Sequence, residues 1–346
     1  MAQINKPNEY FNTVLYAGNG TTQSVTGVNF QPDFSWLKCR STAYNHRLYD
    51  SVRGALKNLV SNSTSAEATA DNGLSAFNSD GFTVTEGGDA YNSSGQTYVG
   101  WNWLAGGTAS SNTDGSITST VSANTTSGFS IVSYTGTETN ATIGHGLGVA
   151  PSVVICKARS DTSDWQMYHA SLGATQLIKL NLTDATLTNA IWQDTAPTNN
   201  VFYVGASPSI NGSGETNIAY CFAEKKGFSK FGSYTGNGNA DGTFVYTGFS
   251  PAFVIIKRSS GIASWNIKDN KRNNASTSFN INPRNATLLP NTSDADQDAN
   301  ALDFLSNGFK NKSTGNDVNA SGNTYIYMAF AENPLVGTNN IPTTAR

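Results

Sequence analysis

The chain has 346 residues, which is too long for one small core and suits two or three compact units. Charged residues make up 13% of it, the formal net charge is −3, and no basic run is visible, so the composition argues against a nucleic-acid-binding surface. No apolar stretch approaches the roughly 18 residues of a membrane span, and the first residues lack the basic and apolar regions of a signal peptide. We therefore expect neither membrane insertion nor a signal peptide.

Abundant glycine, asparagine, serine and threonine favour strands and turns over helices. The three cysteines lack metal-binding spacing and suit synthesis in a reducing cytosol. A composition typical of extracellular proteins is thereby combined with a cytosolic route of synthesis. A virus particle that is made in a host and released by lysis would reconcile the two.

Two sequence patterns each occur three times. The first begins around a proline and reads GVNFQPDFSWLKCR from Gly27, GLGVAPSVVICKAR from Gly146 and GFSPAFVIIKR from Gly248. Apolar residues on both alternating faces predict a strand covered on both sides, with the proline at its head. The second pattern alternates like a strand near the end of each copy, and reads GQTYVGWNWLA from Gly95, GETNIAYCFAE from Gly214 and GNTYIYMAFAE from Gly322.

These patterns predict an all-β chain of three tandem, divergent β-sandwich units of jelly-roll or lectin-like type. In chain order we expect an N-terminal arm (1–10), a first repeat (11–104), a linker rich in Gly, Ser, Thr and Asn (105–128), a second repeat (129–226), a third repeat (227–337) and a C-terminal tail (338–346). The second and third repeats are joined by a few residues around Glu224–Phe228, so they should pack closely. The stretch from Asp294 to Leu305 has a helix-like pattern, which its asparagines oppose.

Catalytic patterns are not visible in the sequence. His46, His145 and His169 lie in different segments without metal or triad spacing, and we interpret them as turn or strand-end residues. Glu224 and Glu332 are lone acids that end equivalent strands, where an ion pair with a neighbouring strand is favoured over catalysis. We therefore expect no enzyme activity and no cofactor other than a candidate calcium ion.

Two sets of residues are candidates for binding. Trp165, Tyr168 and Trp265 are taken as exposed aromatic rings that could stack on sugars; in the alternative, each tryptophan fills the core of its own unit. The second set, Asp294, Asp296 and Asp298, resembles the start of a calcium loop, but the glycine and the final glutamate of that pattern are missing. A solvated acidic loop is the alternative.

Five stretches of the chain resemble a repeat family of tailed-phage structural proteins, common in marine phages and cyanophages. They are GSITSTVSANTTSGFSIVSYTG, HGLGVAPSVVICKARS, WQMYHASLG, AYCFAEKKGFSKFGSYTGNGNADGTFVYTGF and NTYIYMAFAENP. Proteins of that family are labelled virion or tail-fibre proteins and often accompany concanavalin-A-like lectin domains. The first repeat departs most from the pattern, with Trp101 and Trp103 where the other repeats have different residues, so its role could differ.

The resemblance implies a virion protein that is made in the host cytoplasm and displayed on the particle exterior. A tail-fibre-type adhesin that binds host-surface glycan is the first hypothesis, a capsid or tail decoration protein that contacts other virion proteins the second, and a glycan depolymerase the third. The resemblance also implies a homo-oligomer, with a trimer expected because tail fibres usually are trimeric. We expect residues 1–10 and adjoining sheet edges to form the assembly contact.

Overall fold

The computed structural model describes residues 3–69, 72–86, 88, 90–272 and 282–336. Its regular structure is almost entirely antiparallel β-sheet, which confirms the all-β prediction. The helical segments among these residues are the short turns η1 (Pro7–Glu9), η2 (Ala190–Trp192) and α1 (Pro208–Asn211). No helix within the described ranges has the length and apolar character needed to cross a membrane. The predicted C-terminal tail (338–346) lies outside the described residues.

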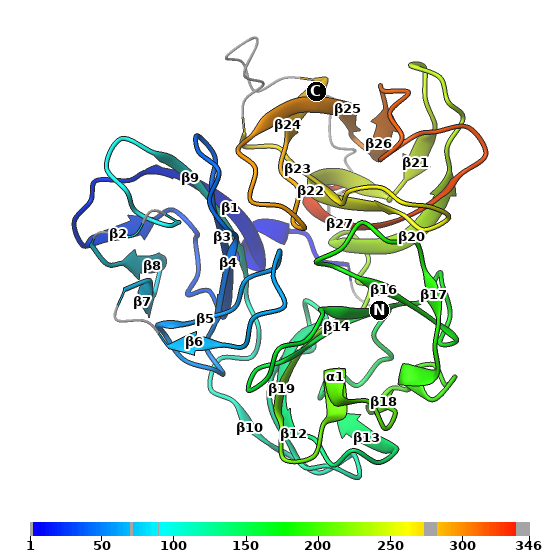
Figure 1. The fold of residues 1–346 in the computed structure, drawn as a ribbon. Coiled ribbons are helices and arrows are strands. Elements are labelled where there is room, and N and C mark those ends of the chain that lie inside the picture. Colours follow the sequence, from blue (N-terminus) through cyan, green and yellow to red (C-terminus); the bar gives the residue numbers. More distant parts are fainter. Residues whose placement is uncertain (1–2, 70–71, 87, 89, 273–281, 337–346) are drawn as a thin grey trace.

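Three sets of strands in the described chain share one order, and we call them the first, second and third inner sheets. The first is β1 (Phe11–Ala17), β9 (Thr97–Trp103), β3 (Phe34–Cys39) and β4 (Arg47–Asp50). At the matching places the second has β12 (Phe129–Thr135), β19 (Thr216–Phe222), β14 (Val153–Ala158) and β15 (Gln166–His169). The third has β20 (Ser229–Thr235), β27 (Thr324–Pro334), β22 (Phe249–Arg258) and β23 (Asn266–Asp269). Figure 1 shows the three lobes grouped around a common centre.

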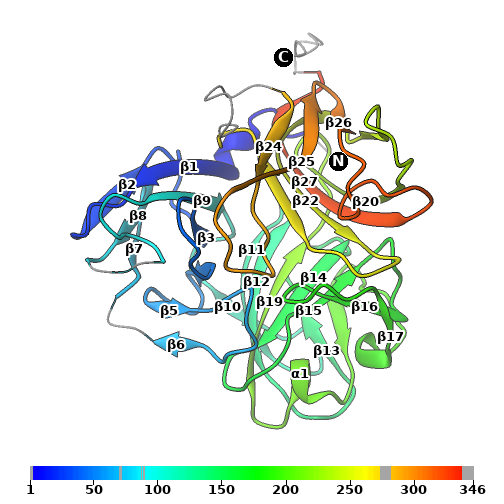
Figure 2. The ribbon, with the colours of Figure 1, turned by 45° about the horizontal axis from the view of Figure 1, so that its top comes forward.

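An outer sheet lies over the far side of each inner sheet. The outer strands are β2 (Gln23–Thr26), β8 (Gly81–Val84) and β7 (Leu74–Asn78) in the first lobe, β13 (Ala141–Gly144) and β18 (Val201–Val204) in the second, and β21 (Phe244–Tyr246), β26 (Gly308–Asn311), β25 (Gln297–Leu305) and β24 (Arg284–Thr287) in the third. Figure 2 shows β2, β7 and β8 at one side of the molecule. Each lobe is thus a two-layered sandwich; that the lobes descend from three copies of one unit stays a prediction.

The remaining strands extend the sheets at their margins. β10 (Ser110–Asn112) and β11 (Ser119–Asn124) continue the second inner sheet beyond β12, β16 (Gln176–Lys179) and β17 (Leu187–Thr188) continue it beyond β15, and β5 (Lys57–Asn58) pairs with β6 (Ala68–Thr69). Residues 105–128 were predicted to be a linker, but they contain two strands of the second sheet. A strand at a sheet margin needs few apolar residues, because β-branched threonines suit it and a single valine, Val121, reaches the core.

Alternating side chains of the inner strands enter two different cores. In β3, Phe34 and Trp36 face the centre of the molecule, whereas Leu37 faces the outer sheet of its lobe. β14 and β22 repeat this division, with Ile155 and Ile255 at the centre. The central core takes residues from all three inner sheets, so the prediction of strands covered on both sides is confirmed.

One local prediction was wrong, and one stretch of ambiguous pattern forms a strand. Pro251 does not head its strand: β22 begins at Phe249, and the pairing with β27 shifts register at Pro251, where a bulge accommodates the missing N–H. The stretch with the helix-like pattern forms β25 instead. Pairing with β26 and burial of Leu302 and Phe304 outweigh its weak helix signal.

The N-terminal segment is part of the fold and not a separate arm. Ile4 belongs to the central core and donates its backbone N–H to the carbonyl of Lys226, and Pro7 is buried. Tyr10 packs edge-on against Phe228. Because this segment closes the core where the second and third lobes join, removing it would expose apolar surface.

A closed ring of hydrogen bonds joins the three lobes. In each lobe, the residue directly before the fourth strand of the inner sheet (β4, β15 or β23) donates a ring N–H to a main-chain carbonyl of a neighbouring lobe. The bonds are Trp165 Nε1 to Val60 O (2.9 Å), Trp265 Nε1 to Lys179 O (3.0 Å) and His46 Nε2 to Leu289 O (3.1 Å). His46 Nδ1 accepts from Trp36 Nε1, which places the histidine proton on Nε2.

Buried ion pairs connect the first lobe to both of its neighbours. Arg53 pairs with Asp50 and Glu67, and Glu67 also pairs with Arg159 of the second lobe (2.9 Å). The third lobe repeats the arrangement, and its members are Asp269, Arg272, Asp296 and, from the first lobe, Arg40. Although burial opposes ionisation of a carboxyl group, Arg53 and Arg159 hold the pKa of Glu67 below its usual value.

The contact between the second and third lobes is built differently. His169 lies in β15 where the other lobes have Asp50 and Asp269, and its Nε2 donates to the carbonyl of Tyr327 (3.3 Å). Its Nδ1 accepts the N–H of Ser171, so both ring nitrogens are satisfied by a neutral imidazole. Burial lowers the pKa of His169 to about 4.

Replacing Trp165 by phenylalanine should lower the free energy of unfolding by about 2–4 kcal/mol, because it leaves the buried Val60 carbonyl without a donor and opens a small cavity. Trp192 is the matched control, since its Nε1 is equally buried but has no hydrogen-bond partner among the described residues. Urea denaturation should show a clearly smaller loss for Trp192→Phe. Equal losses would show that the ring of bonds contributes nothing measurable.

Acid should weaken the molecule in a defined window. Because the folded pKa of His169 lies below its unfolded value of roughly 6.5, the unfolded chain binds the extra proton between pH 6.5 and about 4, and stability falls as pH is lowered through that window. The full effect of this histidine is about 3 kcal/mol. Denaturant titrations from pH 8 to 4 should show a shallower decline for His169→Gln; an unchanged slope would contradict the assignment.

Candidate functional site

The structure overturns the prediction that three aromatic rings are exposed to bind sugars. Trp165 and Trp265 are 0% and 1% exposed, and Tyr168 is 4% exposed. The tryptophans face the central core, and Tyr168 packs edge-on against Trp192 beneath the second outer sheet. The alternative, that each tryptophan fills a core, agrees better with the structure. The core that they fill is shared by all three lobes, however, and does not belong to a single unit.

The structure does not bring the candidate calcium ligands together. Asp296 is engaged by Arg40 and Arg272, Asp294 accepts a hydrogen bond from the Thr292 hydroxyl (2.9 Å), and Asp298 lies exposed on β25. Within the described parts of the chain, no group of three or more His, Cys, Asp or Glu side chains is placed to hold a metal ion. In this acidic stretch, Asp296 forms the ion pairs between lobes, and Asp298 is an exposed residue of strand β25.

Glu224 occupies the structural role expected of it. Its carboxylate accepts hydrogen bonds from Lys230 Nζ (2.8 Å) and from the backbone N–H of Phe231, both on the neighbouring strand β20.

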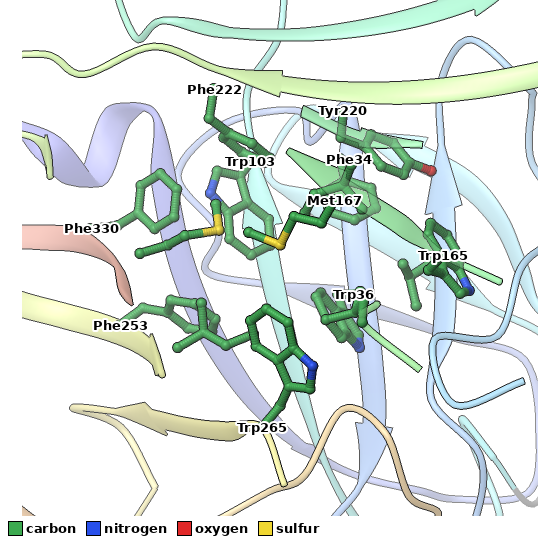
Figure 3. Close-up of a pocket in the computed structure, with 15 residues that line it drawn as sticks. Phe34, Trp36, Trp103, Trp165, Met167, Tyr220, Phe222, Phe253, Trp265 and Phe330 are labelled. Atoms are coloured by element: carbon green, nitrogen blue, oxygen red, sulfur yellow. The ribbon is translucent and has the colours of Figure 1, made fainter. Parts of the chain in front are cut away.

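The centre of the molecule contains an apolar cavity of about 30 Å³. Side chains from all three inner sheets point toward one another there, as Figure 3 shows. Among those around the cavity are Trp36, Trp103, Trp165, Tyr220, Trp265 and Phe330. Its size and lining are those of a packing defect in a hydrophobic core, so we do not regard it as a binding site.

A hollow of about 540 Å³ on the first lobe has the lining of a binding site. We call it the tyrosine pocket, and its wall includes Tyr44, Asn45, Arg47, Tyr49, Asn58 and Tyr91. Tyr49 and Tyr91 are largely buried and form its floor, Tyr44 is half-buried, and Asn45 is exposed. Aromatic rings combined with amides and a guanidinium offer both flat apolar faces and directional hydrogen bonds.

Local structure explains how these side chains meet. Arg47 and Tyr49 alternate along β4, so they project from the same face of the first inner sheet. Arg47 Nη1 donates to Asn58 Oδ1 (2.8 Å), and Asn58 Nδ2 donates to the carbonyl of Ala68, which ties β4 to the ribbon of β5 and β6. Asn45 Oδ1 accepts from Asn62 (2.8 Å). The polar groups of the wall are thereby held before any ligand arrives.

Burial raises the pKa of Tyr49 to about 12, so its phenol stays neutral and keeps its proton at physiological pH. At the matching places of the second lobe, Gln166 and Tyr168 are covered, the latter by Trp192. In the third lobe Lys268 fills the space and donates to the carbonyl of Asn285 (2.8 Å). The tyrosine pocket is thus a feature in which the first lobe differs from the other two.

Sequence reasoning missed the tyrosine pocket because its members follow no spacing motif. Tyr44 lies in a loop, Arg47 and Tyr49 in a short strand, and Tyr91 in a distant turn. The signal that could have pointed to it was the departure of the first repeat from the pattern of the others.

A second surface feature is the exposed strand β21 of the third lobe. Phe244 and Tyr246 are 44% and 59% exposed, while Val245 between them is buried. β21 pairs with β26 on one side and is an end strand of its sheet among the described residues. An end strand with two exposed aromatic side chains favours aggregation, so such a strand is usually covered or used as an interaction surface.

The second lobe shows how such an edge can be covered. At the matching edge of β13, Ile117 donates its backbone N–H to the carbonyl of Thr142 (3.1 Å) and bridges Ile143 in parallel orientation. Ser119 Oγ donates to the carbonyl of Gly144 (2.8 Å). An extended segment of the chain itself therefore occupies in the second lobe the position that no described residue fills beside β21.

Comparison with known proteins gives a family but no activity. A family model described as a domain of unknown function, DUF7483, matches residues 6–334. The chain belongs to the DUF7483 family. The match spans all three inner sheets in a single domain, in keeping with their shared core. No curated protein and no solved structure matches the chain.

Proposed function

We propose that this DUF7483 protein is a virion structural protein displayed on the exterior of a tailed-phage particle, where it acts as a tail-fibre-type adhesin that binds host-surface glycan. The observation that carries the glycan assignment is the tyrosine pocket. The virion assignment rests on the resemblance of five sequence stretches to phage structural repeats. A closed homo-oligomer, with a trimer expected, remains part of the proposal.

The chemistry of the tyrosine pocket suits a sugar. The half-exposed Tyr44 ring can stack on the apolar face of a pyranose, and the exposed amide of Asn45 is fixed near it to bond hydroxyl groups. Arg47, Tyr49 and Asn58 of the wall are held by strands, so little of their conformational entropy is lost on binding. Binding without chemical conversion is the proposed activity, and no cofactor is invoked.

Replacing Tyr44 by alanine should weaken glycan binding roughly tenfold, because about 1–1.5 kcal/mol of ring contact is lost. The wild-type chain should first be tested on an array of bacterial surface polysaccharides, and the variant then measured on those retained. Tyr246→Ala, which removes an exposed ring from another lobe, is the control and should bind normally. Glycan binding that survives Tyr44→Ala and is lost in the control would refute the assignment.

The second candidate function, a decoration protein that contacts other virion proteins, is favoured by the open edge of β21. We infer that an extended segment of another virion protein adds to this edge in parallel orientation, as residues around Ile117 do on β13. Phe244 and Tyr246 would then be covered by its side chains. The two candidates use different lobes, so one chain could serve both.

The double variant Phe244→Ser, Tyr246→Thr should reduce incorporation of the protein into particles several-fold while leaving its stability intact. It copies Ser24 and Thr26, which stand at the matching places of β2. Incorporation can be measured by quantitative mass spectrometry of purified particles made with either chain. Tyr44→Ala serves as the control, and normal incorporation of the double variant would exclude the β21 edge as the contact.

A further inference from the structure

The tyrosine pocket contains an arginine whose charge no described residue neutralises. Arg47 makes one hydrogen bond, from Nη1 to Asn58 Oδ1, and no ion pair with any residue of the described chain. Its Nε is buried without a hydrogen-bond partner. No aspartate or glutamate is among the described residues that line the pocket. A half-buried guanidinium with unused donors is a costly arrangement that a bound anion would relieve.

Another arginine of the first lobe, Arg53, does have carboxylate partners. Arg53 lies six residues further along, and Asp50 and Glu67 neutralise it completely. At the place that matches Arg47, the second lobe has Gln166 and the third has Asn266, both neutral. The unpaired charge is therefore specific to the one lobe that has the tyrosine pocket.

We propose that the tyrosine pocket selects an acidic glycan, whose carboxylate or sulfate group binds Arg47 while a sugar ring lies against Tyr44. This inference rests on the proposed glycan-binding function and narrows it to a ligand class. Because Nη1 is committed to Asn58 and Nε is buried, Nη2 is the part of the guanidinium left to donate to an oxygen of an anion. Tyr49, held neutral, adds no competing negative charge.

The test compares ligands that differ in charge alone. The full chain is titrated with oligogalacturonate and with its methyl ester, and in a second arm with dextran sulfate and dextran, so that the two sources of negative charge are separated. We expect at least one acidic ligand to bind tenfold or more tightly than its neutral form, as a charge-assisted hydrogen-bond pair implies. Arg47→Gln, which installs the residue of the second lobe, should reduce that preference to about onefold.

Two further variants distinguish a specific site from general attraction. Arg47→Lys keeps the charge but loses the planar pair of donors and should retain a minor part of the preference. Lys57→Gln removes a neighbouring cation outside the pocket and should leave the preference unchanged. Equal losses in Arg47→Gln and Lys57→Gln, with binding that disappears in 0.5 M salt, would overturn the proposal in favour of non-specific electrostatics.

The possible failures are separable. Equal affinity of the wild-type chain for acidic and neutral ligands, with both weakened by Tyr44→Ala, would overturn the acidic-ligand inference and leave the adhesin function standing. Absence of binding to every polysaccharide on the array would remove both. Circular dichroism melts establish that each variant is folded, and if Arg47→Gln does not fold, the ligand preference of the wild-type chain and of Arg47→Lys decides.

Discussion

Three inner sheets bury aromatic side chains against one another at a single centre, and most other features of the molecule satisfy the polar groups that this burial isolates from water. A strand whose two faces are both covered leaves its margins as the place where polar side chains can reach partners. Lys38, Lys157 and Lys257 illustrate the constraint: each is buried, each donates Nζ to the carbonyl of the following residue, and burial lowers each pKa to about 8. Two of them also bond a carbonyl of another lobe.

The three contacts between lobes are not equivalent, and the differences are coordinated. Where an aspartate is replaced by His169, the arginine of the buried ion pair is absent as well, since Leu172 stands where Arg53 and Arg272 lie. The exchange removes an acid and a base together, so no unpaired charge is left inside. Arg47 differs from the buried lysines as well, because their Nζ atoms are bonded to main-chain carbonyls whereas its Nε has no hydrogen-bond partner.

The sequence predicted what repetition and alternation encode. The alternation after Pro32 predicts a strand covered on both faces because the β period is two, and the structure places Phe34 and Leu37 in different cores. The sequence did not reveal what each face would pack against. No residue near Trp165 indicates that its indole will donate a hydrogen bond to the carbonyl of Val60, about a hundred residues earlier. The tyrosine pocket could not be read either, because Tyr44 and Tyr91 meet through tertiary packing alone.

The bond from His46 to Leu289 has a consequence for synthesis. A chain emerging from the ribosome in order completes the first lobe long before the third exists, so the apolar face that carries Trp36 and Trp101 stays exposed to water until the last quarter of the chain is available. Closure of such distant contacts is slow, because the entropy of a long loop is lost before the contact forms. A nascent chain stalled after two lobes would therefore be a substrate for chaperones or for aggregation.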